Sequence, residues 1–289
     1  MTRSIRTLVG AIATAMLVTL AGLAALPASA ITGGEPDGEG HPNVALIVFY
    51  DATGRYRCSA TLASPTVLIT AAHCTSGTLG KTAVTFESFL SEAGPFPAPV
   101  AADPTKGYTA AELAAAGYLS GKAYTHPEYS DFTDIDNWND VGVIKLDKPV
   151  AGITPAKLTP LNYLDSFKAP KLRKTEFTVV CYGTEVRKLN GTTGQPVPMS
   201  YPLLRRVTTS VGQKLDPQVL QMNGNEKDPF GGGGTCFGDS GGPVFKNGYI
   251  VADTSYGYTN NCRYLGGYQR LDIPVVQDWL ADFGLQPAK

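Results

Sequence analysis

A glycine-dense turn around a serine constrains this chain more than any other stretch. Residues Gly234 to Pro243 read Gly-Thr-Cys-Phe-Gly-Asp-Ser-Gly-Gly-Pro, with glycines on both sides of Ser240. Glycine adopts backbone angles that residues with a Cβ avoid, so the amide N–H groups of such a turn can converge on one point. A hydroxyl beside convergent N–H donors suits acyl transfer, because it joins a nucleophile to a site for an oxyanion.

Two further motifs carry a histidine and an aspartate. His73 lies in Thr-Ala-Ala-His-Cys, directly after an apolar run, and Asp140 lies in Asn-Asp-Val-Gly-Val-Ile. Taken singly, these residues could be a core histidine, a strand-capping aspartate and a turn serine. In the order His, Asp, Ser, the three motifs together resemble the trypsin/chymotrypsin family of serine endopeptidases, and the resemblance extends from Ile31 to the C-terminal helix.

The resemblance implies a catalytic role for each motif. Ser240 would be the nucleophile, His73 the general base and then the general acid, and Asp140 the group that orients the imidazole. The amides of Gly238 and Ser240 would form the oxyanion hole. The resemblance therefore implies that the protein is a secreted serine endopeptidase that works through an acyl-enzyme.

The resemblance also implies a substrate-binding surface. Ser255, Tyr256 and Gly257 match the segment that pairs with an extended substrate, and Gly266 matches a pocket-wall glycine. Gly234 stands at the base of the primary pocket, where an acid would select basic side chains, so we expect apolar or aromatic specificity. Asp253 departs from the family's apolar pattern, and basic substrates would be accepted if its side chain reached the pocket.

The fold expected is all-β, with two packed antiparallel six-stranded β-barrels and a C-terminal α-helix. The resemblance places the first barrel at 31–155, the second at 156–271, and the helix and tail at 272–289. Short apolar runs between turns rich in glycine and proline fit such a protein. Strands are expected at 44–49, 55–62, 67–70, 141–146, 176–182, 204–210 and 248–255, and a helix at 273–283.

Residues 75–123 fit the family least well. The stretch from His73 to Asp140 is longer than the family core requires, so we interpret 75–123 as an inserted loop. Thr109 precedes a run of helix formers that ends at Gly117, which predicts a short helix within it. We expect this insertion to be a structural elaboration rather than part of the substrate site.

The first thirty residues have the pattern of a signal peptide. Arg3 and Arg6 precede a long apolar run, and Ala-Ser-Ala ends at residue 30. A membrane anchor is the competing interpretation, but the small-residue cleavage site favours removal and secretion. By resemblance, cleavage would free the amino group of Ile31 to pair with Asp239, so signal peptidase itself would be the activating protease.

Five cysteines in a secreted chain predict disulfides and one residual thiol. The family resemblance pairs Cys58 with Cys74 and Cys236 with Cys262, which leaves Cys181 as a small buried hydrophobe in an apolar strand. No metal-ligand spacing of cysteines or histidines occurs. The acidic run that ends at Asp140 is interpreted as solvated loop rather than a calcium site, and no cofactor is expected.

The expected partners are polypeptide substrates and possible protein inhibitors. A net charge of −1 without basic runs argues against nucleic acid, no membrane partner is expected after signal cleavage, and the protein is expected to be a monomer. The alternative function is an inactive relative that serves as a binding module. An α/β-hydrolase esterase is excluded, because its triad follows the order Ser, Asp, His.

Overall fold

The computed structural model describes residue 31 and residues 34–92, 98–167, 169–184, 202–225, 232–259 and 262–288. The expected signal peptide at 1–30 lies outside these residues. Among the described helices, none combines the length and the apolar character needed to cross a membrane.

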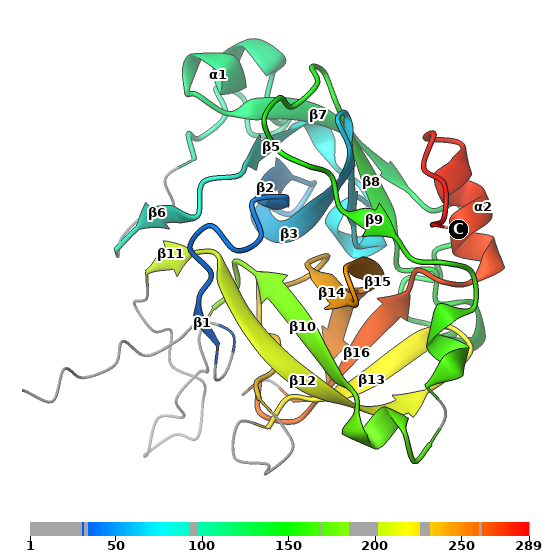
Figure 1. Ribbon diagram of the computed structural model, residues 1–289. Coiled ribbons are helices and arrows are strands. Elements are labelled where there is room, and N and C mark those ends of the chain that lie inside the picture. Colours follow the sequence, from blue (N-terminus) through cyan, green and yellow to red (C-terminus); the bar gives the residue numbers. More distant parts are fainter. Residues whose placement is uncertain are drawn as a thin grey trace, which may run out of the picture.

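The first barrel is a closed ring of six antiparallel strands (Figure 1). Alternating side chains from these strands fill its interior, and Leu62, Leu68 and Ile144 are completely buried there. The strands are, in ring order, β2 (Val44–Tyr50), β3 (Arg55–Ser64), β4 (Val67–Thr70), β8 (Gly142–Leu146), β7 (Leu119–Thr125) and β5 (Leu79–Thr85).

The second barrel is also a ring of six strands. It is closed because strands 206–215 and 219–223, which end the sheet path, pair with each other. The expected two-barrel fold is therefore confirmed. Short strand β1 (Glu35–Pro36) extends it beside β12 (Arg206–Leu215), and β9 (Lys157–Leu158) runs parallel to β15 (Tyr249–Gly257). The ring comprises β12 (Arg206–Leu215), β10 (Glu176–Cys181), β14 (Pro243–Lys246), β15 (Tyr249–Gly257), β16 (Leu265–Arg270) and β13 (Val219–Asn223).

The predicted C-terminal helix is present as α2 (Pro274–Ala281). Its buried side chains Val276 and Leu280 join Val67 and Ile69 of the first barrel and Ile250 of the second in one apolar cluster. The helix therefore covers apolar residues from both barrels, which favours one fixed arrangement of the two.

The expectation that 75–123 is one inserted loop was wrong. Strands β5 and β7 within it belong to the first barrel, and only the connection between them is inserted. That connection contains β6 (Phe89–Ser91), which pairs with β11 (Leu203–Leu204), and the predicted helix, confirmed as α1 (Ala110–Ala115). The side chains of Thr109 and Glu112 cap α1 by bonding each other's backbone amides.

The error has a physical reason. β5 reads Leu-Gly-Lys-Thr-Ala-Val-Thr and β7 reads Leu-Ser-Gly-Lys-Ala-Tyr-Thr, so neither contains a continuous apolar run. Gly121 in β7 is required by packing, because a Cβ there would lie 2.5 Å from Ile144. Glycine and lysine lower the apparent strand propensity, although β5 pairs with β2 and β7, and β7 also pairs with β8.

Candidate active site

His73 and Asp140 are brought together by two neighbouring strands. His73 lies in the short 3₁₀ helix η1 (Ala72–Cys74) directly after β4, and Asp140 lies just before β8. Since β4 and β8 are antiparallel partners, with Thr70 opposite Gly142, the end of one strand meets the start of the other. The sequence separation of the two residues is therefore closed by the barrel itself.

The carboxylate of Asp140 is completely buried and is held by several donors. Its Oδ2 lies 2.9 Å from His73 Nδ1, and its Oδ1 accepts the backbone N–H of His73 at 2.9 Å. From the second barrel, the hydroxyl of Ser255 donates to Oδ2 at 2.6 Å. The hydrogen bonds of this carboxylate therefore join both barrels.

The two groups shift each other's titration. Burial alone would lower the pKa of His73, but the nearby charge and hydrogen bond of Asp140 outweigh it, with Asp131 adding to the effect, and raise that pKa above 6.5. Burial alone would raise the pKa of Asp140, but His73 and the Ser255 hydroxyl lower it below 3.8. The pair therefore favours an ionised carboxylate beside an imidazole of increased basicity.

Ser240 reaches the same place from the second barrel. Its turn is pressed against the end of β4, because a Cβ on Gly241 would lie 2.6 Å from the backbone nitrogen of Ala71. The backbone N–H of Ser59 donates to the Ser240 carbonyl at 2.8 Å. Within the described part of the chain, the Ser240 hydroxyl makes no hydrogen bond to His73, a contact that often forms only when substrate is bound.

The turn has the backbone conformation that the glycines predict. Gly238 has φ +90° and Gly241 has φ +73°, both in the left-handed region. Between them, Asp239 is buried, and its carboxylate accepts the backbone N–H groups of Gly183 and Cys236 at 2.7 Å each. These bonds tie the turn before Ser240 to the end of β10 through Gly183.

Asp239 has no ion pair with Ile31 among the described residues. Ile31 is buried in the core of the second barrel, with Met222 and Tyr268 in the same cluster. Burial raises the pKa of Asp239 to about 7, although the two amides and the charge of Arg57 favour the ionised form. A fully buried carboxyl with this pKa is poised to gain stability from a cation.

A pocket of about 180 Å³ adjoins Ser240. Of the predicted substrate-binding residues, Ser255, Tyr256 and Gly257 line it. Gly234 and Gly266, which were also predicted to shape the pocket, are not among its lining residues. A Cβ on Gly234 would lie 2.6 Å from the Gly224 Cα, and one on Gly266 would lie 2.9 Å from the Tyr268 hydroxyl. The remaining lining residues are Thr235, Cys236, Phe237, Thr254, Thr259 and Cys262.

Both predicted disulfides are present. Cys58–Cys74 brackets His73, and Cys236–Cys262 joins the serine turn to the wall of the pocket. Cys181 is free and buried among apolar residues, as predicted. The disulfides therefore tie the polypeptide on either side of the site.

Sequence reasoning missed Trp138. Its indole N–H donates at 2.9 Å to the hydroxyl of Ser255, which in turn donates to Asp140. The indole ring lies between Phe132 and Tyr256, with ring centroids 5.2 and 5.1 Å away. No local pattern indicates this role, because the partner hydroxyl is 117 residues away in the sequence.

A pair of buried glutamines was also missed. Gln269 accepts the backbone N–H of Asp140 through Oε1 at 2.9 Å, and its Nε2 donates to Gln218 Oε1 at 3.2 Å. Gln218 donates to the side chain of Asn139 at 3.2 Å. Asn139 has φ +45°, so these amides hold a backbone conformation that few side chains tolerate.

Asp253 lies close enough to Asp140 for their charges to interact, and it is absent from the pocket wall. It is 1% exposed, and neither carboxylate oxygen has a hydrogen-bond partner among the described residues. Asp253 lies on β15 two residues before Ser255, and the register of β15 with β16 shifts between Thr254 and Tyr256. Burial, and then the charge of Asp140, raise its pKa well above 3.8, which favours the neutral acid. Basic substrates would have been expected if the Asp253 side chain reached the pocket. It does not line the pocket, so it supplies no counter-charge there.

Two antiparallel barrels that meet at a histidine–aspartate pair and a glycine-flanked serine define the chymotrypsin-like class of proteins. The family model described as Trypsin matches residues 31–280. The chain therefore belongs to the trypsin family. A curated relative described as trypsin, from Saccharopolyspora erythraea, is 27% identical over an alignment of 237 residues that covers 78% of this chain and 86% of the relative.

Solved structures share the fold at low sequence identity. HL collagenase superposes with a TM-score of 0.56 at 18% identity, covering 90% of this chain and 98% of its own. Human heparin binding protein superposes with a TM-score of 0.57 at 15% identity, covering 90% of this chain and 100% of its own. At these identities the likeness concerns the fold alone.

The Trp138→Phe variant tests the indole bond to Ser255. We expect the free energy of unfolding to fall by about 1 kcal/mol more than the smaller ring alone would cause, because one buried hydrogen bond is removed. The matched control is Trp279→Phe, since the indole of the half-buried Trp279 has no hydrogen-bond partner in the described chain. Chemical denaturation of both variants measures the difference, and equal losses would contradict the assignment.

The Asp253→Val variant tests the unpartnered acid. We expect the free energy of unfolding to rise by about 1–3 kcal/mol at neutral pH, because a buried polar group without a hydrogen-bond partner in the described chain is removed. A raised pKa in the folded state means that Asp253 costs stability as the pH rises above its unfolded value near 4. The gain should therefore widen between pH 4 and 7 in denaturation experiments; a gain independent of pH, or a loss, would contradict this account.

Proposed function

We propose that the protein is a secreted serine endopeptidase that uses Ser240, His73 and Asp140. The observation that carries the proposal is the buried Asp140 carboxylate, bonded to His73 Nδ1 at 2.9 Å and to Ser255 at 2.6 Å beside the serine turn. A buried aspartate that orients an imidazole supports general-base catalysis. Membership of the trypsin family supports the same chemistry.

In the proposed mechanism, His73 Nε2 takes the proton of the Ser240 hydroxyl as its oxygen attacks the scissile carbonyl. The amides of Gly238 and Ser240 stabilise the resulting oxyanion. The imidazolium, stabilised by Asp140, gives its proton to the departing amine and leaves an acyl-enzyme. Water, activated by His73, then releases the acid and restores Ser240.

The proposed primary specificity is for bulky apolar or aromatic side chains. The described residues of the pocket wall include hydroxyls and Tyr256 but no carboxylate. A buried lysine or arginine would lose its hydration without gaining a counter-charge there, which is costly. Extended substrates would also pair with the backbone of Tyr256 and Gly257, an edge that fits β-strand addition.

The proposed activation step is cleavage before Ile31. The chain is continuous through Ala30 and Ile31, so the amino group of Ile31 becomes a cation only after that bond is cut. Asp239 is a fully buried carboxyl with a pKa of about 7. Pairing with the new ammonium would lower this pKa and hold the serine turn in place. Signal peptidase would make this cut during secretion.

The proposed partners are polypeptide substrates and protein inhibitors, and the proposed state is an extracellular monomer. The binding-module alternative is not favoured, because the chain keeps the serine, histidine and aspartate together with Asp239. Human heparin binding protein resembles this chain in fold, but that likeness gives no support for heparin binding here.

Proteome-derived peptides give the direct test of the proposed function. Secreted protein, first checked to begin at Ile31 by N-terminal analysis, is incubated with the peptides beside its Ser240→Ala variant. We expect cleavage after large apolar or aromatic residues, with turnover falling by about 10⁴–10⁶-fold in the variant. Equal cleavage by both proteins would contradict the proposal, and a preference for cleavage after arginine would contradict the pocket assignment.

The pH dependence tests the role of Asp140. Catalysis requires neutral His73, so kcat/KM should rise with pH through a midpoint above 6.5. In Asp140→Asn the charge that raises this pKa is lost and burial remains, so the midpoint should move to lower pH while kcat falls by about 10⁴. Asp147→Asn, which affects an aspartate paired with Lys81, is the matched control and should leave the midpoint in place.

A further inference from the structure

A tight turn near His73 holds two residues in a backbone conformation that is rare for side chains of their kind. Asp131 has φ +51° and Phe132 has φ +62°. The backbone N–H of Thr133 donates to the carbonyl of Ser130 at 3.2 Å, which closes the turn around them. Positive φ at both central positions marks a type I′ turn, which favours glycine, asparagine or aspartate there. Asp131 suits this conformation, whereas the bulky Phe132 adopts it under strain.

The Phe132 ring contacts the imidazole of the proposed general base. Its centroid lies 5.4 Å from that of His73, 5.2 Å from that of Trp138 and 5.7 Å from that of Tyr129. Phe132 is nevertheless 41% exposed, so burial in a core does not explain the choice of residue. Strained backbone conformations concentrate at functional sites, where the surrounding contacts maintain them. The ring contact with His73 therefore gives the strained turn a candidate role.

The same turn brings a carboxylate close to the imidazole. Asp131 directly precedes Phe132, and the hydroxyl of Tyr129 donates to its Oδ1 at 3.4 Å. Burial opposes protonation of His73, but the charges of Asp140 and then of Asp131 outweigh it and raise the pKa of His73. Asp140 is completely buried, whereas Asp131 is exposed to solvent. Dissolved salt therefore screens the charge of Asp131 much more than that of Asp140.

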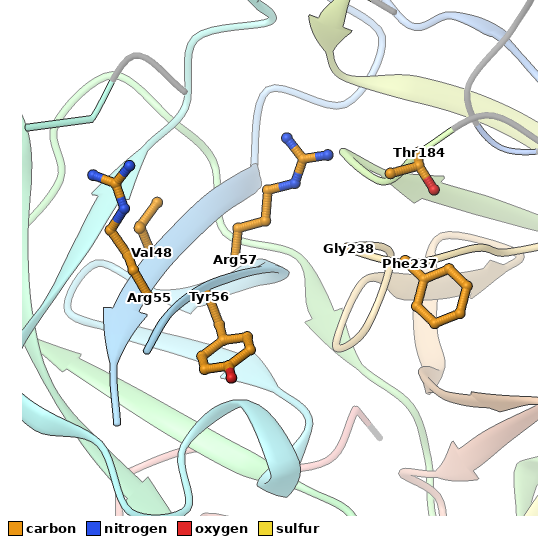
Figure 2. Close-up of a pocket in the computed structure, with 7 residues that line it drawn as sticks. All are labelled: Val48, Arg55, Tyr56, Arg57, Thr184, Phe237 and Gly238. Atoms are coloured by element: carbon orange, nitrogen blue, oxygen red, sulfur yellow. The ribbon is translucent and has the colours of Figure 1, made fainter. Parts of the chain in front are cut away.

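The other titratable groups around the site are neutral or act elsewhere. Burial raises the pKa of Tyr129 and of Asp253, so both favour their neutral forms, and the serine hydroxyls of the second barrel carry no charge. Arg57 lines a separate pocket of about 410 Å³ beside the serine turn (Figure 2), and its charge acts on Asp239. Within the described chain, the carboxylate of the strained turn is therefore the second charge that acts on His73.

We propose that the Asp131–Phe132 turn is a second support of His73 in catalysis. The Phe132 ring holds the imidazole in position, and the Asp131 carboxylate stabilises the imidazolium that forms when the Ser240 proton is taken. Both are positioning residues, because they act through His73. This inference rests on the proposed endopeptidase function and assigns a role within an acidic run that the sequence alone indicates to be solvated loop.

The Asp131→Asn variant tests the charge. Asparagine also tolerates a left-handed backbone, so the turn should persist. We expect the pH midpoint of kcat/KM to fall, because the imidazolium loses a nearby negative charge, and the plateau to fall by about 2–5-fold. Asp136→Asn removes an exposed carboxylate from the same loop and is the matched control, which should keep the wild-type midpoint. An unchanged midpoint in Asp131→Asn at low salt, or an equal fall in the control, would overturn the proposal.

Ionic strength gives a second signature of an exposed charge. Between about 0.01 M and 1 M salt, the Debye length falls from about 30 Å to about 3 Å. The wild-type midpoint should therefore move toward that of Asp131→Asn as salt is added, whereas the midpoint of the variant should change much less. Equal salt dependence in the two proteins would count against a role for Asp131.

Two substitutions of Phe132 separate the ring from the backbone. Phe132→Ala and Phe132→Gly both remove the ring, so kcat should fall by about 10-fold with little change in KM, because the imidazole is less well positioned. Ile135→Ala changes another exposed apolar residue of this loop and should keep the wild-type kcat. Glycine suits a positive φ, so the glycine variant should have the higher free energy of unfolding of the two. A wild-type kcat in both variants, an effect confined to KM, or a glycine variant less stable than the alanine variant would contradict the proposal.

Nuclear magnetic resonance titration of the His73 ring separates this inference from the proposed function, since it requires no turnover. The chain has three histidines, so the ring signals can be assigned by single substitutions. If the His73 ring titrates at lower pH in Asp131→Asn but no peptide is cleaved by the wild-type protein, the proposed function fails and the effect of Asp131 on the imidazole stands. If peptides are cleaved and the ring titrates alike in both proteins, this inference fails and the peptidase proposal stands.

Discussion

The completely buried carboxylate of Asp140 is the constraint on which the rest of the site depends. A buried charge is tolerated only where several donors meet it. Here His73 supplies them from the first barrel, while Ser255 and Gln269 bond the side chain and the backbone of Asp140 from the second. The two barrels must therefore dock in one arrangement for this carboxylate to be stable. That arrangement also places the Ser240 turn against the end of β4, just before His73.

The residues around this carboxylate differ in what they supply. Trp138 extends the donor chain through Ser255, and Gln218 helps hold the left-handed backbone at Asn139. Asp253, by contrast, is buried near Asp140 with no hydrogen-bond partner in the described chain. A second ionised carboxylate at this place would oppose the first, so the site is most stable while Asp253 remains protonated.

How far the sequence predicts this structure depends on the range of the interaction. The β4 strand, the cap of α1 by Thr109 and the left-handed turn at Gly238 follow from local residue types. Strands β5 and β7 did not, because their partners across the barrel outweigh a weak local pattern. The three motifs predict the site through family resemblance, whereas Trp138 and Gln269 contact it across more than a hundred residues, and no local pattern predicts such contacts.

We propose that both barrels together make Ser240 a nucleophile. Intact mass spectrometry and peptide mapping after treatment of the folded, secreted protein with a fluorophosphonate test it most directly. The account predicts one adduct per chain, located on Ser240, and none once the protein is unfolded before treatment. A folded protein that remains unlabelled, or that carries its adduct on another residue, would contradict it.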